Sequence, residues 1–276
     1  MRIDRYRLLL KYIALFIVLF GCIWFINTSK SESTSEPRDF SEIKEEGVLR
    51  VAIEYNDMSY AISGDSVSGL DYELIKEFAR DQNLKLQVLP LMSFSERVKQ
   101  IDHGKCDVIA SPIVKTKGLK DSLLLTDPIV LSRQVLIQRT TAQETYKPVT
   151  TSLDLAKKTI FIIKDSPAVL RIRNLEEEIG DTIYVEELEK YGQEQLISLV
   201  ANGDIDYAVC DENIAKNVID SFPNVETKAI VGFTQLYSWG VSKQSPILLE
   251  TLNKWIKESR HKKEVIDLFK KYNYKR

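Results

Sequence analysis

Histidine and cysteine are scarce in this sequence. Its 276 residues include two histidines, His103 and His261, and three cysteines, Cys22, Cys106 and Cys210. None of them stands in a CxxC pair or an HExxH motif, the spacings on which structural zinc sites and zinc hydrolases depend. The sequence therefore indicates no metal site of either kind.

An excess of basic charge is also missing. The chain carries 38 lysines and arginines against 40 aspartates and glutamates, a formal net charge of −2. A protein that binds nucleic acid needs a basic surface to neutralise phosphates, so we expect no nucleic-acid partner. The glycine patterns of nucleotide-binding folds, GxGxxG and the P-loop, are absent as well, and we expect no cofactor.

The first 26 residues have the pattern of an export signal or a membrane anchor. Three arginines and Lys11 precede an uninterrupted apolar run over residues 12–26. As an α-helix this run measures about 22 Å, and it nearly spans a bilayer when residues 8–10 are added. Because the basic flank stays in the cytoplasm, we expect the rest of the chain to be attached to the inner or outer membrane, facing the periplasm or extracytoplasmic space.

Three fates of this leader stay open: an uncleaved anchor, a lipoprotein and a cleaved secretory signal. Residues 19–22 (LFGC) resemble a bacterial lipobox, which makes Cys22 a candidate for lipidation. No small-x-small cleavage site follows the apolar run, which weighs against plain secretion. The polar, serine-rich and acidic residues 27–46 show no apolar period, and we expect them to form a tether.

After Gly47 the composition is that of a folded domain, and short β-rich runs alternate with helical periods. We expect strands at residues 48–53, 84–89, 107–110, 159–163, 182–186 and 207–210. We expect helices at residues 71–81, 168–178, 193–202 and 212–221, and one that opens with the capping box at residues 93–96 and ends at Gly104. This alternation predicts an α/β fold with parallel sheets and helices on both faces.

Two further features concern the organisation of the chain. The polar stretch 140–151 separates two alternating runs, which suggests that a second lobe begins near it. Two amphipathic helices at residues 247–259 and 261–272 have no strand between them, so we expect them to pack on an existing lobe. In open α/β sheets ligands bind beyond the carboxyl ends of strands. The loops expected there span residues 54–60, 111–120, 164–168 and 211–213.

Motifs in these segments resemble, in order and spacing, those of solute-binding protein family 3, the periplasmic binding proteins of type 2. Within that family the chain resembles the N-terminal domain of membrane-bound lytic murein transglycosylase F. The motifs are residues 43–51 (IKEEGVLRV), 59–60, 68–78 (SGLDYELIKEF), 107–110 (DVIA), 125–129 (LTDPI), 133–139 (RQVLIQR), 199–211 (LVANGDIDYAVCD) and 238–246 (SWGVSKQSP).

The resemblance implies a two-lobe α/β fold with two hinge strands that close around a ligand. The hinge strands would lie near residues 129–133 and 238–242. Lobe 1 would comprise residues 47–129 and, after the return of the chain, 241–276, with lobe 2 at 130–240. Cys106 and Cys210 would then lie in different lobes and stay free thiols.

The resemblance also implies site residues. In relatives that bind amino acids, an aspartate at the end of a lobe 2 strand takes the ligand's amino group, and Asp211 matches it. An arginine that grips the ligand carboxylate is replaced here by Leu119, so a bidentate clamp is missing at that position. Lys117 and Lys120 are the neighbouring candidates for this role.

Further candidate ligand-binding residues follow other strands. Glu54 and Tyr60 lie where relatives place a polar contact and an aromatic floor, and Ser111 is expected to end a lobe 1 strand. Lys164 and Ser166 belong to a loop that opens a lobe 2 helix, where backbone amides favour anions.

The function implied is an extracytoplasmic, membrane-tethered protein that captures an amino acid, a short peptide or a peptidoglycan fragment by hinge closure. Two alternatives stay open: a lytic murein transglycosylase-related regulatory protein, with a cell-wall enzyme as partner, and a substrate receptor for an ABC permease. We expect no enzymatic activity, because lytic transglycosylases of this kind cleave glycan in a separate lysozyme-like domain that would follow the terminal helix pair.

Overall fold

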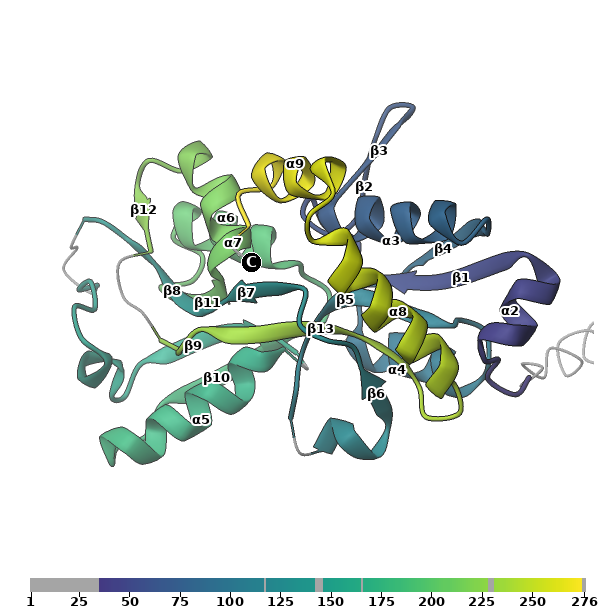
Figure 1. Ribbon diagram of the computed structural model, residues 1–276. Helices are drawn as coiled ribbons and strands as arrows, with labels where there is room; N and C mark the ends of the chain where they lie inside the picture. Colours follow the sequence, from purple (N-terminus) through teal and green to yellow (C-terminus); the bar gives the residue numbers. More distant parts are fainter. Residues whose placement is uncertain (1–34, 117, 142–145, 165, 228–230, 275–276) are drawn as a thin grey trace, which may run out of the picture. The chain divides into compact units, whose positions relative to one another are not determined.

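Two β-sheets, one in each lobe, form the centre of the fold in the computed structural model (Figure 1). The structure describes residues 35–274 except 117, 142–145, 165 and 228–230. Residues 36–276 form one compact unit, separate from residues 1–35, and the unit is described here by itself. The predicted leader, most of the predicted tether and Cys22 lie outside the described residues.

The sheet of the first lobe has the strand order β4-β1-β5-β13-β6, and β7 extends it by pairing with β13. β1 runs parallel to β4 and β5, whereas β13 is antiparallel to β5, β6 and β7. The strands are β1 (Val48–Ile53), β4 (Lys85–Pro90), β5 (Val108–Val114), β6 (Leu123–Leu125), β7 (Val130–Ser132) and β13 (Gln235–Ser242).

The sheet of the second lobe has the order β10-β9-β11-β8-β12. β9 is parallel to β10 and β11, and β8 is antiparallel to β11 and β12. The strands are β8 (Gln134–Arg139), β9 (Thr159–Ile163), β10 (Tyr184–Leu188), β11 (Tyr207–Asp211) and β12 (Val225–Glu226). A separate hairpin, β2 (Ala61–Ser63) with β3 (Ser66–Ser68), extends from the first lobe.

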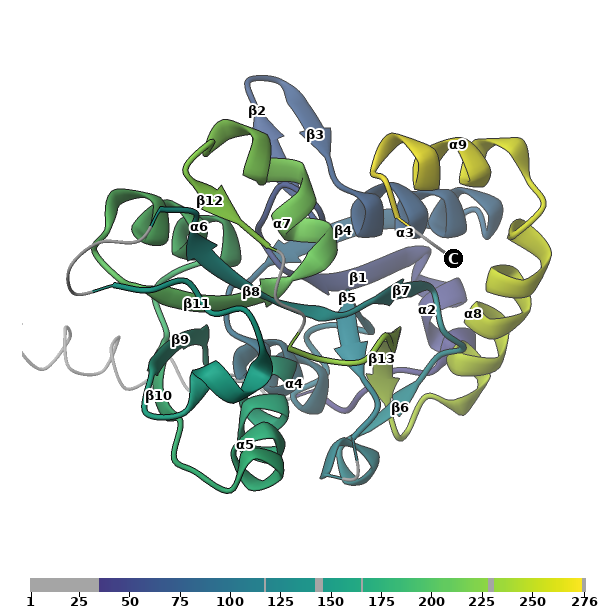
Figure 2. The same cartoon turned by 90° about the vertical axis from the view of Figure 1, so that its left-hand side faces the viewer.

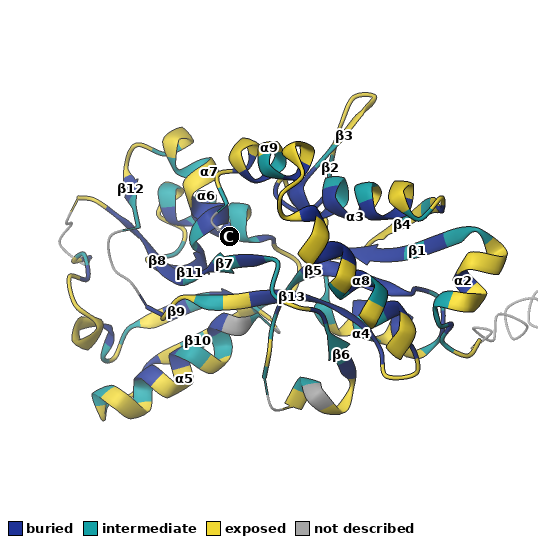
Figure 3. Cartoon of the chain, in the orientation of Figure 1, coloured by how far each residue is buried: buried dark blue, intermediate teal, exposed yellow. Residues whose placement is uncertain are grey.

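Helices cover these sheets with their buried sides inward and their exposed sides outward (Figure 3). In the second lobe, separate apolar clusters pack against the sheet. The first-lobe helices are α2 (Phe40–Glu46), α3 (Leu70–Asp81), α4 (Phe94–Asp102), α8 (Pro246–Ser259) and α9 (Lys263–Lys271). The second-lobe helices are α5 (Pro167–Ile179), α6 (Gln193–Asn202) and α7 (Glu212–Val218), and 3-10 turns lie at η1 (Gly118–Asp121), η2 (Ser152–Leu155) and η3 (Ile219–Ser221).

The core of this unit is self-contained. The four apolar clusters found among the described residues all lie between Phe40 and Tyr274. Residues 36–276 therefore carry their own hydrophobic core and can be studied apart from residues 1–35. In the part of the chain that the structure describes, none of the helices has both the length and the hydrophobicity needed to cross a bilayer.

The prediction of parallel sheets is wrong, because both sheets are mixed. β7 and β8 follow one another and carry the chain from the first sheet to the second. The strands that run against the parallel ones are β13 in the first sheet, which is antiparallel to β5, and β8 in the second, which is antiparallel to β11. Hydrophobic periodicity carries no information on strand direction, so this reversal was not visible in the sequence. β8 also shows that the second lobe begins before the polar stretch at residues 140–151.

The chain passes between the lobes twice. The first passage follows β7, close to the predicted residues 129–133. The second was expected at residues 238–242, but these pair with β5 and β6 inside the first sheet. The passage lies earlier, where the N–H groups of Val231 and Gly232 donate to the carbonyl of Gln134 and Gln235 pairs with Ser132.

The predicted tether at residues 27–46 is wrong for its last part, which forms α2. Asp39 caps this helix in a capping box with Glu42, and Gly47 ends it at φ 69° in the left-handed region. Ile43 is the one fully buried residue of the helix, which is why no apolar period marked it.

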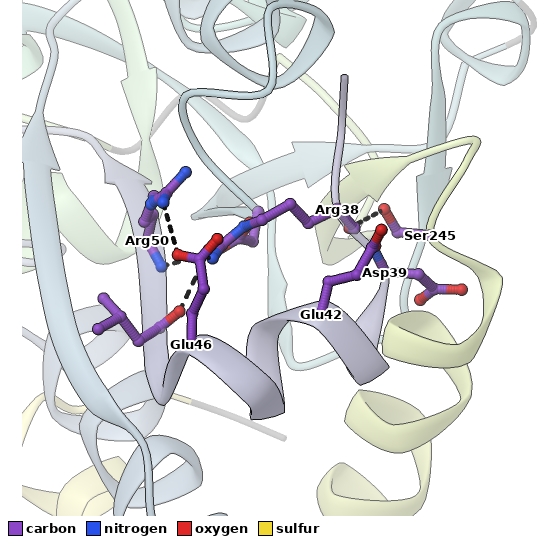
Figure 4. Close-up of polar contacts among 8 residues, drawn as sticks. Arg38, Asp39, Glu42, Glu46, Arg50 and Ser245 are labelled. Carbon is purple, nitrogen blue, oxygen red and sulfur yellow. Dashed lines mark hydrogen bonds and ion pairs between the residues drawn. The ribbon is translucent and has the colours of Figure 1, made fainter. Parts of the chain in front are cut away.

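Arg38 fastens this N-terminal helix to the core. Its Nε and Nη2 donate to the two carboxylate oxygens of Asp107 at 3.1 and 2.6 Å, and both side chains are buried. The carboxylate of Asp107 also accepts from the backbone N–H of Arg50 at 2.7 Å. Figure 4 shows the surrounding contacts, in which Glu46 binds Arg50 and the Oγ of Ser245 donates to the carbonyl of Arg38.

Arg38→Ala is expected to lower the free energy of unfolding by about 3–5 kcal/mol, because it leaves the buried carboxylate of Asp107 without its cation. Denaturant unfolding followed by circular dichroism measures this. The matched control is Arg80→Ala, since Arg80 is 64% exposed in its pair with Glu77 and such surface pairs contribute about 1 kcal/mol or less. Equal effects of the two substitutions would contradict the anchoring role of Arg38.

A buried carboxylate also links α3 to the long strand β13. Asp71 accepts from the Oγ of Ser59 and from the indole Nε1 of Trp239, both at 2.8 Å. Burial raises the pKa of Asp71 to about 7, although the hydrogen bonds from Trp239 and Ser59 oppose the rise. The folded state therefore holds this proton at a pH where an unfolded aspartate has lost it.

Because the folded pKa lies above the unfolded one, Asp71 contributes stability at low pH that is lost as pH rises through about 7. Asp71→Asn keeps an acceptor for Trp239 without the charge. Its advantage in unfolding free energy over the wild type is expected to grow by about 3 kcal/mol between pH 4.5 and 7.5. Urea titrations at both values measure this, and parallel stability curves would show that Asp71 titrates normally.

Candidate functional site

A cavity of about 860 Å³ lies between the two lobes. Its size is that of a site for a small organic ligand, at the upper end of the usual range. Both lobes supply its walls. The lining residues that carry charge are Glu54, Arg97, Lys164, Arg173, Glu187 and Asp211, and the aromatic ones are Phe94, Tyr237 and Tyr274.

The lobes touch beside this cavity. Ile214 of α7 packs in the apolar cluster of the first lobe, and the amide of Asn217 contacts the sulfur of Met58 in the loop after β1. The backbone N–H of Asp57 lies within reach of the carboxylate of Glu194 and lowers its pKa, although burial raises that pKa overall. The two lobes are thus in contact beside the cavity, as a closed arrangement requires.

Asp211 lies where the second lobe meets both passages between the lobes. It ends β11 and caps α7, and its Oδ1 accepts from the Ser132 hydroxyl at 2.7 Å and from the Asn213 N–H at 2.9 Å. The hydroxyl of Tyr237 on β13 is a further partner. Burial raises the pKa of Asp211, and the main groups that lower it are neutral donors: the hydroxyls of Ser132 and Tyr237 and the N–H groups of Asn213 and Ile214. Asp211 is both a helix cap and a cavity residue.

Glu54 lies on the opposite wall and is paired. Its Oε2 is 3.1 Å from the Nη2 of Arg97, and the Nη1 of Arg97 donates to the carbonyls of Leu91 and Met92 at 2.7 and 2.9 Å. Arg97 is 3% exposed, and its Nε has no partner among the described residues. Arg97 therefore brings a buried, paired guanidinium to the wall of the cavity.

The sequence analysis missed Arg97. This residue shares one face of α4 with Phe94, Val98 and Ile101, which pack in one apolar cluster. A charge on the apolar face of a helix was the signal that could have identified it, since arginine is rarely buried unless it is paired. Arg97 supplies a guanidinium that Leu119, which also lines the cavity, does not.

Two predicted site residues lie beneath the cavity and are not among those that line it. Ser111 is fully buried, and its Oγ accepts from the backbone N–H of Glu54 at 2.9 Å. It does not end a strand as expected, because β5 continues to Val114. Tyr60 lies in the apolar core with its ring edge-to-face against Tyr72.

The remaining predicted residues belong to loops at the cavity's edge. Lys164 and Ser166 line it, Lys164 with an ion pair to Glu189 and Ser166 as the N-cap of α5. Lys117 lies outside the described residues, as does the side chain of Lys120. Cys106 and Cys210 are buried free thiols, as predicted. The described residues hold no cluster of three or more metal-binding side chains.

Solved structures with this fold include solute receptors. A mutant of ArgBP from T. maritima superimposes with a TM-score of 0.71 at 24% sequence identity, over 84% of this chain and 98% of the other. The solute receptor for L-cysteine of Neisseria gonorrhoeae gives a TM-score of 0.73 at 18% identity, over 85% and 93%.

Curated relatives share more of the sequence. The membrane-bound lytic murein transglycosylase F of Photobacterium profundum is 26% identical over 271 residues, 98% of this chain and 51% of the relative. That of Shewanella pealeana is 30% identical over 208 residues, 75% of this chain and 40% of the relative. The chain spans about half the length of such relatives or less.

The family model of bacterial extracellular solute-binding proteins, family 3, matches residues 49–275, which include both sheets and every lining residue of the cavity named above. The resemblance found in the sequence is thereby confirmed. The chain belongs to the bacterial extracellular solute-binding proteins of family 3.

Proposed function

We propose that the protein is a solute receptor that binds an amino acid, a short peptide or a peptidoglycan-derived peptide between its lobes. The observation that carries the proposal is the pair of buried, opposite charges on facing walls of one cavity. Asp211 of the second lobe is a carboxylate held by neutral donors, and Arg97 of the first lobe is a cation that lines the same cavity.

A ligand that carries an ammonium group and a carboxylate would provide a partner of opposite charge for both Asp211 and Arg97. Its ammonium would supply the cation that Asp211 lacks, and its carboxylate would accept from Arg97. Such a ligand touches both lobes only when they are closed, so it favours the closed state through differential contacts. The volume of about 860 Å³ exceeds the needs of one amino acid and favours a peptide-sized ligand.

Ser111 and Tyr60 would act indirectly in this arrangement. Ser111 fixes the backbone of Glu54, whose carboxylate holds Arg97 in position. Lys164, Ser166 and Arg173 lie on the second lobe and would contact the distal part of a longer ligand. Lys117 and Lys120 remain candidates in the loop beside Leu119.

We further propose that the receptor works outside the cytoplasmic membrane, attached through its first 26 residues. Its partner would be an ABC permease or a cell-wall enzyme. The similarity to lytic transglycosylases F favours a second candidate function, a regulatory domain that reports peptidoglycan fragments. The described elements account for binding lobes alone, so we propose no glycan cleavage by residues 36–276.

A thermal-shift screen against amino acids, dipeptides and muropeptides tests binding. A ligand at a hundred times its dissociation constant adds about 2.7 kcal/mol of stability, which raises the melting temperature by about 5–10 °C. Asp211→Asn should abolish the shift, since it keeps an acceptor for Ser132 and Asn213 but loses the charge. Asp220→Asn, on the exposed turn after α7, is the matched control. The proposal fails when no ligand shifts the wild type, or when both variants respond alike.

The carboxylate contact is tested by comparing a ligand with its C-terminal amide. The wild type should prefer the free carboxylate by about 10-fold or more, as expected for a charge-assisted hydrogen bond. Arg97→Lys should reduce this preference to about threefold or less, because a point charge does not reproduce the fork. The ratio is measured within each variant by calorimetry, so losses of stability cancel. If Arg173→Lys removes the preference and Arg97→Lys keeps it, the assignment is wrong.

A further inference from the structure

Tyr274, the third residue after the last helix, belongs to the walls of the cavity between the lobes. It also borders a second hollow of about 530 Å³ on the outer side of α9, together with Ile266, Phe269, Lys270 and Asn273. The side chain of Tyr274 therefore lies between the cavity and the protein surface, next to the end of α9. The sequence analysis did not consider it, because it follows no strand.

The backbone holds Tyr274 in this place by a Schellman motif. Asn273 has φ 54°, in the left-handed region where asparagine is one of the few tolerated residues. Its N–H donates to the carbonyl of Lys270 at 3.2 Å, and the N–H of Tyr274 donates to the carbonyl of Phe269 at 3.0 Å. This paired bonding turns the chain sharply after α9.

α9 itself is fastened to the first lobe. In both views it lies beside α3 (Figures 1 and 2), and the two helices are in contact. The hydroxyl of Tyr272 accepts from the Gly69 N–H at 2.7 Å, and Lys271 pairs with Glu73 of α3 at 2.7 Å. Tyr274 packs against the apolar cluster of this lobe. Its ring thus moves with the first lobe.

The side chain of Tyr274 also lines the cavity to which the second lobe contributes. Asp211, which lines the same cavity, acts on the hydroxyl of Tyr274, and burial together with Asp211, Asp71 and Tyr237 raises the pKa of Tyr274. The partly buried side chain of Tyr274 is carried by one lobe and lines a cavity whose other wall is the second lobe, so it keeps its burial at the cavity only while the lobes stay closed. Opening would expose a large aromatic surface to water, at a cost in free energy.

We propose that Tyr274 is a latch that closes the α9 end of the solute cleft and stabilises the closed state. The latch acts in the protein without ligand, whereas its effect on affinity rests on the proposed receptor function. A solute that bridges the lobes then benefits from a cleft that is already biased toward closure.

Small-angle X-ray scattering of residues 36–276 without ligand tests the latch. Tyr274→Ala should increase the radius of gyration relative to the wild type, because the closed state loses the buried ring. Tyr274→Phe keeps the ring and should leave the radius unchanged. Tyr184→Ala, at a 53% exposed position on the second lobe, is the control for loss of a tyrosine. Equal radii for the wild type and Tyr274→Ala would overturn the latch.

Calorimetry with a ligand from the screen supplies a second measurement. Tyr274→Ala should weaken binding by about 10-fold, the effect of truncating an aromatic contact residue, and Tyr274→Phe by much less. Unchanged affinity in Tyr274→Ala would also overturn the proposal. If the wild type binds no ligand, the receptor function fails, while the scattering result still decides whether the latch exists.

Discussion

The buried carboxylate of Asp211 is the constraint on which the arrangement of the lobes depends. It accepts hydrogen bonds from Ser132 on β7, from the N–H of Asn213 on α7 and from Tyr237 on β13. One side chain thereby joins the second lobe's helix to both strands beside the passages between the lobes. A buried anion held by neutral donors alone is costly, and a ligand cation would relieve that cost. The same residue can therefore organise the hinge and recognise a solute.

In the first lobe, in contrast, the buried charged side chains are neutralised by ion pairs. Arg38 pairs with Asp107, and Arg97 pairs with Glu54, so each buried guanidinium has an acidic partner within the lobe. The two ion pairs differ in their remaining hydrogen bonds and in their position relative to the cavity. Asp107 is fully engaged by Arg38 and Arg50, which suits an anchor, whereas Arg97 lines the cavity and its buried Nε has no partner among the described residues. The first pair is therefore structural, and the second is part of the proposed site.

Much of the fold could be predicted from the sequence, but the direction of the strands in each sheet and the short strands of the hairpin could not. β9 and α6 have the predicted bounds because their apolar residues follow a clear period. The β2–β3 hairpin was not predicted, because its residues are mostly exposed and show no apolar alternation. Family resemblance, and not periodicity, led to Asp211. Arg97 and Tyr274 were missed because one is a charge on an apolar helix face and the other follows the last helix, and neither stands after a strand.

The most direct test of the central claim is calorimetry of ligand binding over a series of pH values, in buffers with different ionisation enthalpies. Asp211 has a raised pKa in the free protein, and an ammonium placed beside it would lower that pKa. Binding of an amine-bearing ligand should therefore release protons, and the release should disappear in Asp211→Asn. Binding without proton release, or a release that persists in this variant, would contradict the role assigned to Asp211.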